Sequence, residues 1–294
     1  MKKHIFYNLW IHDDDELAVI AESEVRSRET LREWPLSYVE RVNLKNGSSR
    51  VYKAQKGSGT EYAFYRTVQA TFIPKAYFCS SDGDAHWMLL EDIDGCHPVP
   101  QNSNALFDLG ILARSQISSL GSECPCKHDL SKKGYSEFVD STVGLLLALL
   151  GDGKLTVTSN DAINRLSDAL SHPEVNRAVN GKGAVLHGDL KCDNILIRHD
   201  GEIMLIDWQN VMFGPEMIDV YSLLATQAVD PVSVAGIGPE ILRLALEIRW
   251  FADCLNDWMP DATFLDAWIA NTEAYIPGII ENNGYNGREV YYFH

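Results

Sequence analysis

The segment from residue 184 to residue 208 constrains the fold and chemistry of this chain more than any other stretch. It holds short apolar runs that are typical of buried strands, with polar residues where the strands end. The runs span 184–186, 195–197 and 203–206, and the polar residues are His187, Asp189, Asn194 and Asp207. Oxygen-bearing side chains at the ends of adjoining strands are what phosphoryl transfer with Mg²⁺ needs.

Each of these polar residues has a predicted task. Asp189 can accept a hydrogen bond from a substrate hydroxyl and take its proton. Asn194 offers a neutral oxygen and Asp207 a charged one, and such a pair suits a Mg²⁺ ion that keeps phosphate and water ligands. His187 is expected to make structural hydrogen bonds, because Asp189 already fills the position of the base. The structural alternative, an Asp-Asn turn that caps backbone donors, explains less of the whole string.

The bulk composition indicates a globular protein. A length of 294 residues permits one large core or two smaller ones and favours two. Hydrophobic residues make up 46% and charged residues 22%, and no apolar run approaches the roughly 18 residues of a membrane span. The first residues lack the apolar core of a signal peptide, so a cytoplasmic location is expected. The six cysteines are scattered and are expected to be free thiols.

The net charge is strongly negative. It is −16, from 25 basic and 41 acidic residues. Such a surface repels nucleic acid and anionic membranes and favours cationic small molecules or partners, although solubility alone would also explain it. We therefore expect no nucleic-acid or membrane partner, and no pattern indicates an oligomeric state.

The first ninety or so residues are predicted to form a small antiparallel sheet with one main helix. The acidic run at 13–15 suits a helix N-terminus, and apolar residues follow it at helical spacing as far as Val25. Residues 45–48 predict an Asn-Gly hairpin turn, and Thr60 would cap a helix over 61–69. The predicted strands are 37–44, 50–55, 76–79 and 86–91.

The pattern becomes helical after residue 94. Helical periodicity is predicted for 104–120, 135–150, 161–170 and 239–276, and the strand–loop–strand segment at 184–207 interrupts it. The expected domains are therefore residues 1–94, which are rich in strands, and residues 95–294, which are mostly helical.

The string from His187 to Asn194, together with Ile206-Asp207-Trp208, resembles the catalytic segments of the protein-kinase-like superfamily. The sequences His-Gly-Asp-Leu and Ile-Asp-Trp are similar to its small-molecule branch, which includes the aminoglycoside phosphotransferases and choline kinases. The resemblance implies a bilobal protein-kinase-like α+β fold. Its small antiparallel β N-lobe with one main helix, residues 1–94, would bind the nucleotide. Its larger, mostly helical C-lobe, residues 95–294, would carry the catalytic and substrate-binding sites.

The resemblance also implies roles for the residues of this string. Asp189 would be the catalytic base, and Asn194 and Asp207 would be the ligands of Mg²⁺, with ATP as the second cofactor. Lys191 stands where protein kinases carry a lysine near the transferred phosphate, so it is assigned a catalytic role. The small-molecule branch more often has another residue at this position.

Two upstream segments extend the resemblance. The strand that contains Lys53 resembles the one whose lysine holds the α- and β-phosphates, and Glu61 resembles the helix glutamate that orients it. Their spacing of eight residues is short for the superfamily. The segment 88–93 resembles the strand and hinge whose backbone reads adenine, which implies that Glu91 and Ile93 bind the nucleotide. No glycine precedes Gly47, so the glycine-rich phosphate loop of protein kinases is absent.

The combined prediction is a kinase that moves the γ-phosphate of ATP to a hydroxyl of a small molecule. An aminoglycoside-like antibiotic and an amino-alcohol or sugar metabolite fit equally well, and acidic residues of 239–276 are candidates for binding an amine. Two other functions stay open. A protein kinase is suggested by Lys191, but Gly214 follows Asp207 by only seven positions, too few for a long peptide-docking segment. A nucleotide-binding regulatory module without turnover fits the missing glycine loop.

Overall fold

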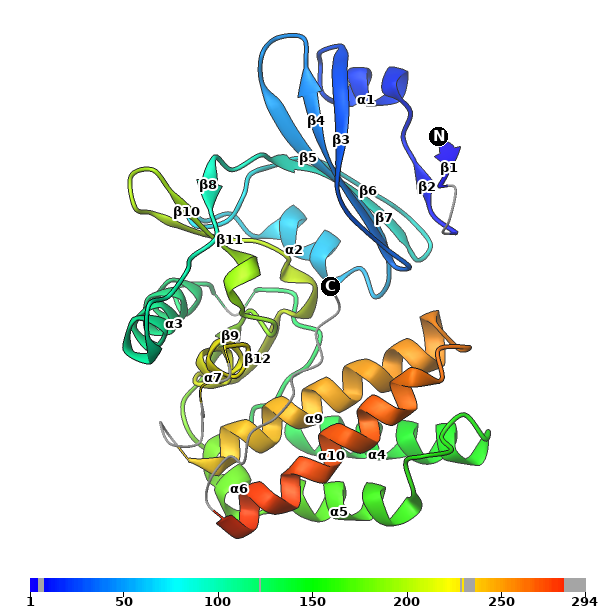
Figure 1. The fold of residues 1–294 in the computed structure, drawn as a ribbon, viewed down its shortest axis with the longest axis vertical. Helices are drawn as coiled ribbons and strands as arrows, with labels where there is room; N and C mark the ends of the chain where they lie inside the picture. Colours follow the sequence, from blue (N-terminus) through cyan, green and yellow to red (C-terminus); the bar gives the residue numbers. More distant parts are fainter. Residues whose placement is uncertain (5–7, 122, 228, 230–235, 283–294) are drawn as a thin grey trace. The chain divides into compact units, whose positions relative to one another are not determined.

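The computed structural model describes residues 1–4, 8–121, 123–227, 229 and 236–282, and the chain forms two compact units (Figure 1). The first unit takes in residues 1–98, 120–127 and 192–211, and the second takes in 99–119, 128–191 and 212–294. One unit is rich in strands and the other is mostly helical, so the predicted α+β class is confirmed. The hairpin at 192–211 belongs to the first unit, although it lies late in the chain.

A five-stranded antiparallel sheet forms the centre of the first unit, in the order β3-β4-β5-β7-β6. Its strands are β3 (Val25–Trp34), β4 (Ser37–Leu44), β5 (Ser49–Lys56), β6 (Ala76–Asp82) and β7 (Ala85–Glu91). Buried and half-buried residues alternate along β4, so one face of this strand is packed and the other is more open. The predicted strands of this region and the hairpin turn at 45–48 are confirmed.

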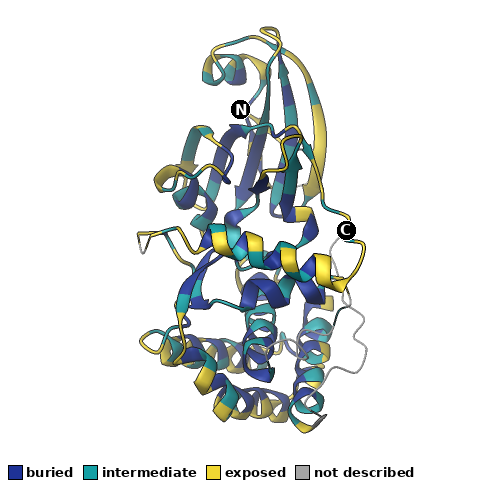
Figure 2. Cartoon of the chain, turned by 90° about the vertical axis from the view of Figure 1, so that its left-hand side faces the viewer, coloured by how far each residue is buried: buried dark blue, intermediate teal, exposed yellow. Residues whose placement is uncertain are grey.

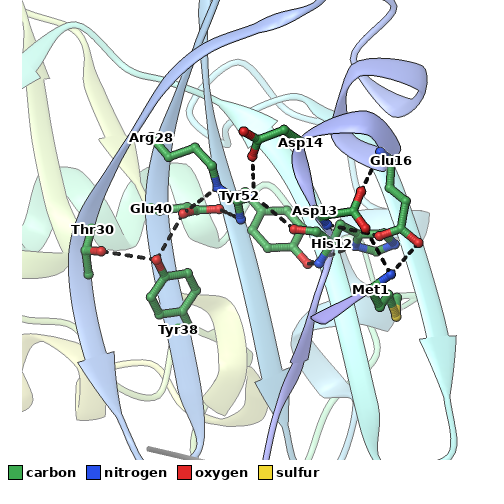
Figure 3. A network of polar contacts seen from close by, with 10 residues as sticks. All are labelled: Met1, His12, Asp13, Asp14, Glu16, Arg28, Thr30, Tyr38, Glu40 and Tyr52. Atoms are coloured by element: carbon green, nitrogen blue, oxygen red, sulfur yellow. Dashed lines mark hydrogen bonds and ion pairs between the residues drawn. The ribbon is translucent and has the colours of Figure 1, made fainter. Parts of the chain in front are cut away.

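The N-terminal segment covers one face of this sheet. It contains β1 (Lys2–Lys3), β2 (Trp10–Ile11) and α1 (Asp14–Ile20). Leu9, Ile11 and Leu17 pack into a buried cluster with side chains of β4, β5 and β7. Arg28 of β3 bonds the side chains of Glu40 and Asp14 beside this cluster (Figure 3). The sheet face opposite this segment is the one on which Lys53 lies.

Helix α1 is shorter than predicted. The helical spacing that continued to Val25 was misleading, because the helix ends at Ile20 and Glu22 takes a left-handed backbone with φ of 54°. From Val25 the chain is extended, since pairing with β4 satisfies its backbone groups. The helix start was predicted well, because Asp13 and Glu16 form a capping box.

Helix α2 (Thr60–Thr67) follows β5 and begins differently from the prediction. Gly59, not Thr60, occupies the cap position, with φ of 71°. Glycine adopts this conformation without steric cost, whereas a threonine does not. A Cβ atom at residue 59 would also lie 2.9 Å from the ring of His86, so a side chain is excluded there on two grounds.

A second small sheet belongs to the first unit. Strands β10 (Ile195–Arg198) and β11 (Ile203–Leu205) form the hairpin predicted at 195–206, and β8 (Gly95–Cys96) pairs with β10. Single 3₁₀ turns, η1 (Cys192–Asn194) and η2 (Trp208–Asn210), flank this hairpin. The backbone N–H of Leu205 donates to the carbonyl of Phe72, which ties the hairpin to the segment after α2.

The second unit consists of helices with one two-stranded sheet. Many of its helices bury one flank and expose the other (Figure 2). They are α3 (Ser103–Ile117), α4 (Tyr135–Gly151), α5 (Asn160–Leu170), α6 (Pro173–Val179), α7 (Ile218–Ala225), α9 (Ile237–Asp253), the π-helical turn η3 (Cys254–Trp258) and α10 (Phe264–Asn282). Strand β9 (Gly183–Leu186) pairs with β12 (Met212–Pro215). The helices predicted at 104–120, 135–150 and 161–170 are confirmed, whereas the helical segment predicted over 239–276 is divided into α9, η3 and α10 by non-helical residues at 259–263. Among the described residues, none of the helices has the length and apolar character to cross a bilayer.

Candidate active site

Lys53 is the centre of a buried ion cluster in the first unit. It lies on β5, and its Nζ is 2.6 Å from Oε2 of Glu61 and 2.7 Å from Oδ1 of Asp207. Burial alone would lower the pKa of Lys53, but the carboxylates of Asp207 and Glu61 outweigh burial and raise it. Lys53 is therefore a fixed positive charge, and the short sequence spacing to Glu61 does not keep the two apart.

Glu61 is fully buried on α2, and an aromatic contact positions this helix. The ring of Phe64 stacks on Trp208 with centroids 4.3 Å apart and an interplanar angle of 13°. Phe64 lies three residues after Glu61, so both face the same side of the helix. Burial raises the pKa of Glu61, and the charge of Lys53 opposes that rise. The sequence signals of this contact are the helical spacing of Phe64 and the aromatic residue directly after Asp207.

Asn194 and Asp207 flank the hairpin of β10 and β11. The backbone N–H of Ile206 donates to the carbonyl of Asn194 at 3.0 Å, which brings the two candidate metal ligands to the same end of the hairpin. Asp207 has φ of 67°, one of two non-glycine residues with positive φ among those described. Such backbone strain is concentrated at functional sites, where the surrounding structure holds it in place.

The donor set of this cluster fits Mg²⁺ better than a metal held by protein alone. Across the described residues, no group of three or more His, Cys, Asp or Glu side chains could hold an ion. Asn194 and Asp207 provide two hard oxygen donors. Mg²⁺ takes one or two such donors from a protein when phosphates and water complete its coordination shell. Lys53 beside them is suited to the charge of those phosphates.

Glu91 and Ile93 stand at the end of β7. The side chain of Glu91 is engaged, because it accepts from Arg198 at 2.7 Å and from the backbone N–H of Lys75 at 3.2 Å. Ile93 is buried, and Asp92 between them bonds Arg41. The side chains of this segment therefore stabilise the strand end. The contact with adenine remains a prediction, and it concerns the backbone of residues 91–93.

The loop that contains Asp189 lies in the second unit and is held by Asp219. The buried carboxylate of Asp219 accepts hydrogen bonds from the backbone N–H groups of His187 at 2.7 Å and Gly188 at 2.9 Å. Burial raises the pKa of Asp219, and these two bonds oppose the rise. Gly188 has φ of 79°, so glycine between His187 and Asp189 allows the turn that exposes both bonded nitrogens. Asp219 thus braces the backbone of this loop.

Asp189 and Lys191 form an ion pair on this loop. Nζ of Lys191 is 3.2 Å from Oδ2 of Asp189, and both side chains are partly exposed. His187 is fully buried, in keeping with a structural task rather than that of a base. The structure thus groups Lys53, Glu61, Asn194 and Asp207 in the first unit, and Asp189, Lys191, His187 and Asp219 in the second.

Most carboxylates predicted as candidates for amine binding already have partners. Glu240 and Glu247 bond Arg243, Asp253 bonds Arg249, and Glu273 bonds Arg165. Asp266 accepts from the backbone of 156–158. Asp257 and Asp261 are left without a cationic partner among the described residues. The tryptophans of this region pack on other rings, as in the pairs Trp250–Trp258 and Phe251–Trp268.

Comparisons with known proteins agree with this arrangement. A model of the phosphotransferase enzyme family matches residues 48–275. No curated protein sequence matches the chain.

Several solved structures have a similar fold at low sequence identity. The gentamicin–APH(2")-IIa complex has a TM-score of 0.57 at 13% identity, covering 90% of this chain and 97% of that one. Macrolide 2'-phosphotransferase MphH from Brachybacterium faecium has a TM-score of 0.57 at 12% identity, covering 87% and 96%. A protein provisionally assigned as a fructosamine-3-kinase, from Thermobifida fusca YX-ER1, has a TM-score of 0.59 at 13% identity, covering 90% and 98%.

The family match spans most of the chain, and the similar structures share the fold that the motifs at 187–208 predict. The family expected from those motifs is therefore confirmed. The chain belongs to the phosphotransferase enzyme family and shares the protein-kinase-like fold of solved small-molecule phosphotransferases.

Proposed function

We propose that this enzyme transfers the γ-phosphate of ATP to a hydroxyl of a small molecule, with Mg²⁺ as the metal. The observation that carries the proposal is the burial of Lys53 between Glu61 and Asp207. Ion pairs with the two carboxylates offset the cost of burying this lysine, and a fixed positive charge beside a carboxylate suits the phosphates of a nucleotide and their metal. One of the similar solved structures is a streptomycin–ATP complex of APH(2")-IIa, which supports ATP as the donor.

On the nucleotide side, Lys53 would hold the α- and β-phosphates while Glu61 keeps it in place. Asn194 and Asp207 would hold Mg²⁺ through their oxygens. The metal would neutralise the charge of the phosphates. The backbone of 91–93 would contact the adenine, because the strand β7 ends there and the side chains of Glu91 and Asp92 are turned to other partners.

On the acceptor side, Asp189 would orient the hydroxyl and take its proton as the new bond to phosphorus forms. Its fixed backbone is an advantage, because in a loose transition state the main task is orientation. Lys191, 3.2 Å from Asp189, would add positive charge near the transferred group.

The acceptor is proposed to be small rather than a peptide. The chain enters β12 five residues after Asp207, and this strand pairs fully with β9, so the segment that docks peptides in protein kinases has no room to form. A cationic acceptor would have to be recognised by residues other than the paired carboxylates of α9 and α10. Asp257 and Asp261 are the candidates in that region.

The test is a screen for acceptor-stimulated ADP release with aminoglycosides, cyclic peptide antibiotics, choline-like amines and neutral sugars. Mass spectrometry of the acceptor would show the gain of one phosphoryl group. Asp189→Asn is the matched variant, which we expect to lose turnover by at least about a hundredfold while binding MgATP as the wild type does. Unchanged turnover of this variant with the true acceptor would overturn the mechanism.

The regulatory alternative predicts a different result. A module without turnover would bind MgATP and show no acceptor-dependent ADP release in any arm of the screen, and Asp189→Asn would then be indistinguishable from the wild type.

A further inference from the structure

The turn between β3 and β4 lacks the means to cradle phosphates with its backbone. It consists of Pro35 and Leu36 between the paired residues Trp34 and Ser37, so it is a two-residue hairpin without glycine. Pro35 has no N–H to donate, and Leu36 is buried, with its carbonyl accepting from the backbone of Lys56. This turn therefore offers no glycine-rich stretch of backbone N–H groups to a phosphate.

A β-bulge in β3 places the side chain of Arg32 where a phosphate-binding group is expected, in place of backbone N–H groups. Arg28 and Thr30 pair with Val42 and Glu40, and their side chains bond Glu40 and Tyr38 on the face covered by the N-terminal segment (Figure 3). Simple alternation would place Arg32 on that same face.

The register shifts between Thr30 and Arg32, however, so that Arg32 pairs with Val39. Val39 in turn pairs with Lys53 on β5. Directly paired residues project from the same face of a sheet, so the bulge turns Arg32 to the face of Lys53. Arg32, Val39 and Lys53 thus form one row across three neighbouring strands.

The two cations of this row approach the same carboxylate. Lys53 Nζ is 2.7 Å from Oδ1 of Asp207, and Arg32 Nη1 is 4.0 Å from Oδ2. Their surroundings differ, because the side chain of Lys53 is 9% exposed and that of Arg32 is 46% exposed. Lys53 is fixed, whereas Arg32 is at a distance too long for a hydrogen bond and is open to a ligand.

We propose that Arg32 is a phosphate-positioning residue, which binds the terminal phosphates of the nucleotide in place of a glycine-rich loop. Its guanidinium presents a planar fork of donors suited to phosphate oxygens. Binding of a metal to Asp207 would neutralise the carboxylate that Arg32 approaches and leave the guanidinium to the phosphates. The inference rests on the proposed function, since it requires a nucleotide at Lys53 and Asp207.

The experiment is calorimetric binding of ATP, ADP and AMP, each with Mg²⁺, to the wild type and to Arg32→Gln, Arg32→Lys and Arg26→Gln. Arg26 is an exposed residue of the same strand, so Arg26→Gln makes the same charge change elsewhere. Thermal unfolding of each variant reports whether the fold is intact.

We expect Arg32→Gln to weaken ATP binding by about tenfold, ADP binding by less and AMP binding not at all. Arg32→Lys should recover part of the loss, and Arg26→Gln should match the wild type. An unchanged ratio of ATP to AMP affinity in Arg32→Gln would overturn the inference, whether the three affinities stay the same or fall together. The proposed function would survive that result if the wild type binds MgATP. A wild type that binds neither ATP nor ADP would overturn both.

Discussion

The carboxylate of Asp219 accepts the backbone N–H of His187 at 2.7 Å, two residues before the candidate base Asp189. The other carboxylate oxygen of Asp219 accepts from the backbone N–H of Gly188. Replacing Asp219 with Asn leaves one oxygen where two backbone donors point, so the loop must shift. We expect kcat to fall by about a hundredfold with little change in the Kd for MgATP, because misplacement of a catalytic group by about 1 Å has that effect. Steady-state kinetics and calorimetry would check this, and equal losses in both quantities would contradict a role confined to the loop.

The cluster of Lys53, Glu61 and Asp207 makes a prediction about stability. Lys53→Met leaves two carboxylates facing each other, one of them fully buried, and should lower the free energy of unfolding by about 3–5 kcal/mol. Adding Glu61→Gln should restore part of this loss, because the remaining repulsion is removed. Urea unfolding of the single and double variants measures the coupling.

The matched control for this cluster is Lys45→Met. Lys45 also pairs with a glutamate, Glu24, but both side chains are largely exposed, so no measurable change is expected. A Lys53→Met protein as stable as the Lys45→Met protein would show that the buried cluster contributes nothing to folding.

Asp266 makes the second unit sensitive to acid. Burial raises the pKa of Asp266, but hydrogen bonds from the backbone of Val157, Thr156 and Thr158 outweigh it and lower the pKa below its ordinary value. A lowered pKa in the folded state means that the stabilisation is complete above the ordinary value of about 3.9 and is lost as the pH falls through the folded value.

Asp266→Asn should therefore cost about 2 kcal/mol at pH 7 and progressively less below pH of about 4. Thermal unfolding of both proteins at pH 7 and at several pH values below about 4 measures the difference. A difference that stays constant with pH would mean that the charge of Asp266 has no part in stability.

His12 makes a corresponding prediction for the first unit. Burial lowers the pKa of His12 more than the nearby acidic residue Glu16 raises it, and its ring packs edge-on against Tyr52, Phe78 and Trp87. The folded pKa lies below the unfolded one, so the stabilisation is full above about pH 6.5 and is lost as the pH falls through the folded value. His12→Phe should flatten the loss of stability between about pH 6.5 and 5. Exposed His199 provides the control, and His199→Gln should leave the pH profile as it is.

The parts of this enzyme that could be predicted from sequence are those encoded locally. The strand, loop and hairpin of 184–207 follow from short apolar runs and the polar residues between them, and the helices after residue 104 follow from their periodicity.

The features that were missed depend on pairing between distant segments. Arg32 faces Lys53 only because of a bulge, and a bulge is set by the register of β3 against β4. The apolar spacing near Val25 suits both a helix and a strand, and pairing with β4 decides for the strand. The acidic residues of α9 and α10 looked available for a ligand, since arginines such as Arg165 reach them only in the folded protein.

The left-handed backbone of Asp207 determines which replacement of this residue is informative. Alanine is disfavoured at φ of 67°, so Asp207→Ala would combine backbone strain with the loss of a metal ligand and exaggerate the importance of the carboxylate. Asparagine tolerates that conformation and differs from aspartate chiefly in charge, so it isolates the electrostatic part. Asp207→Gly would relieve the backbone strain while it removes the carboxylate, so we expect a protein that is more stable and yet inactive. Its stability would then understate the importance of the carboxylate.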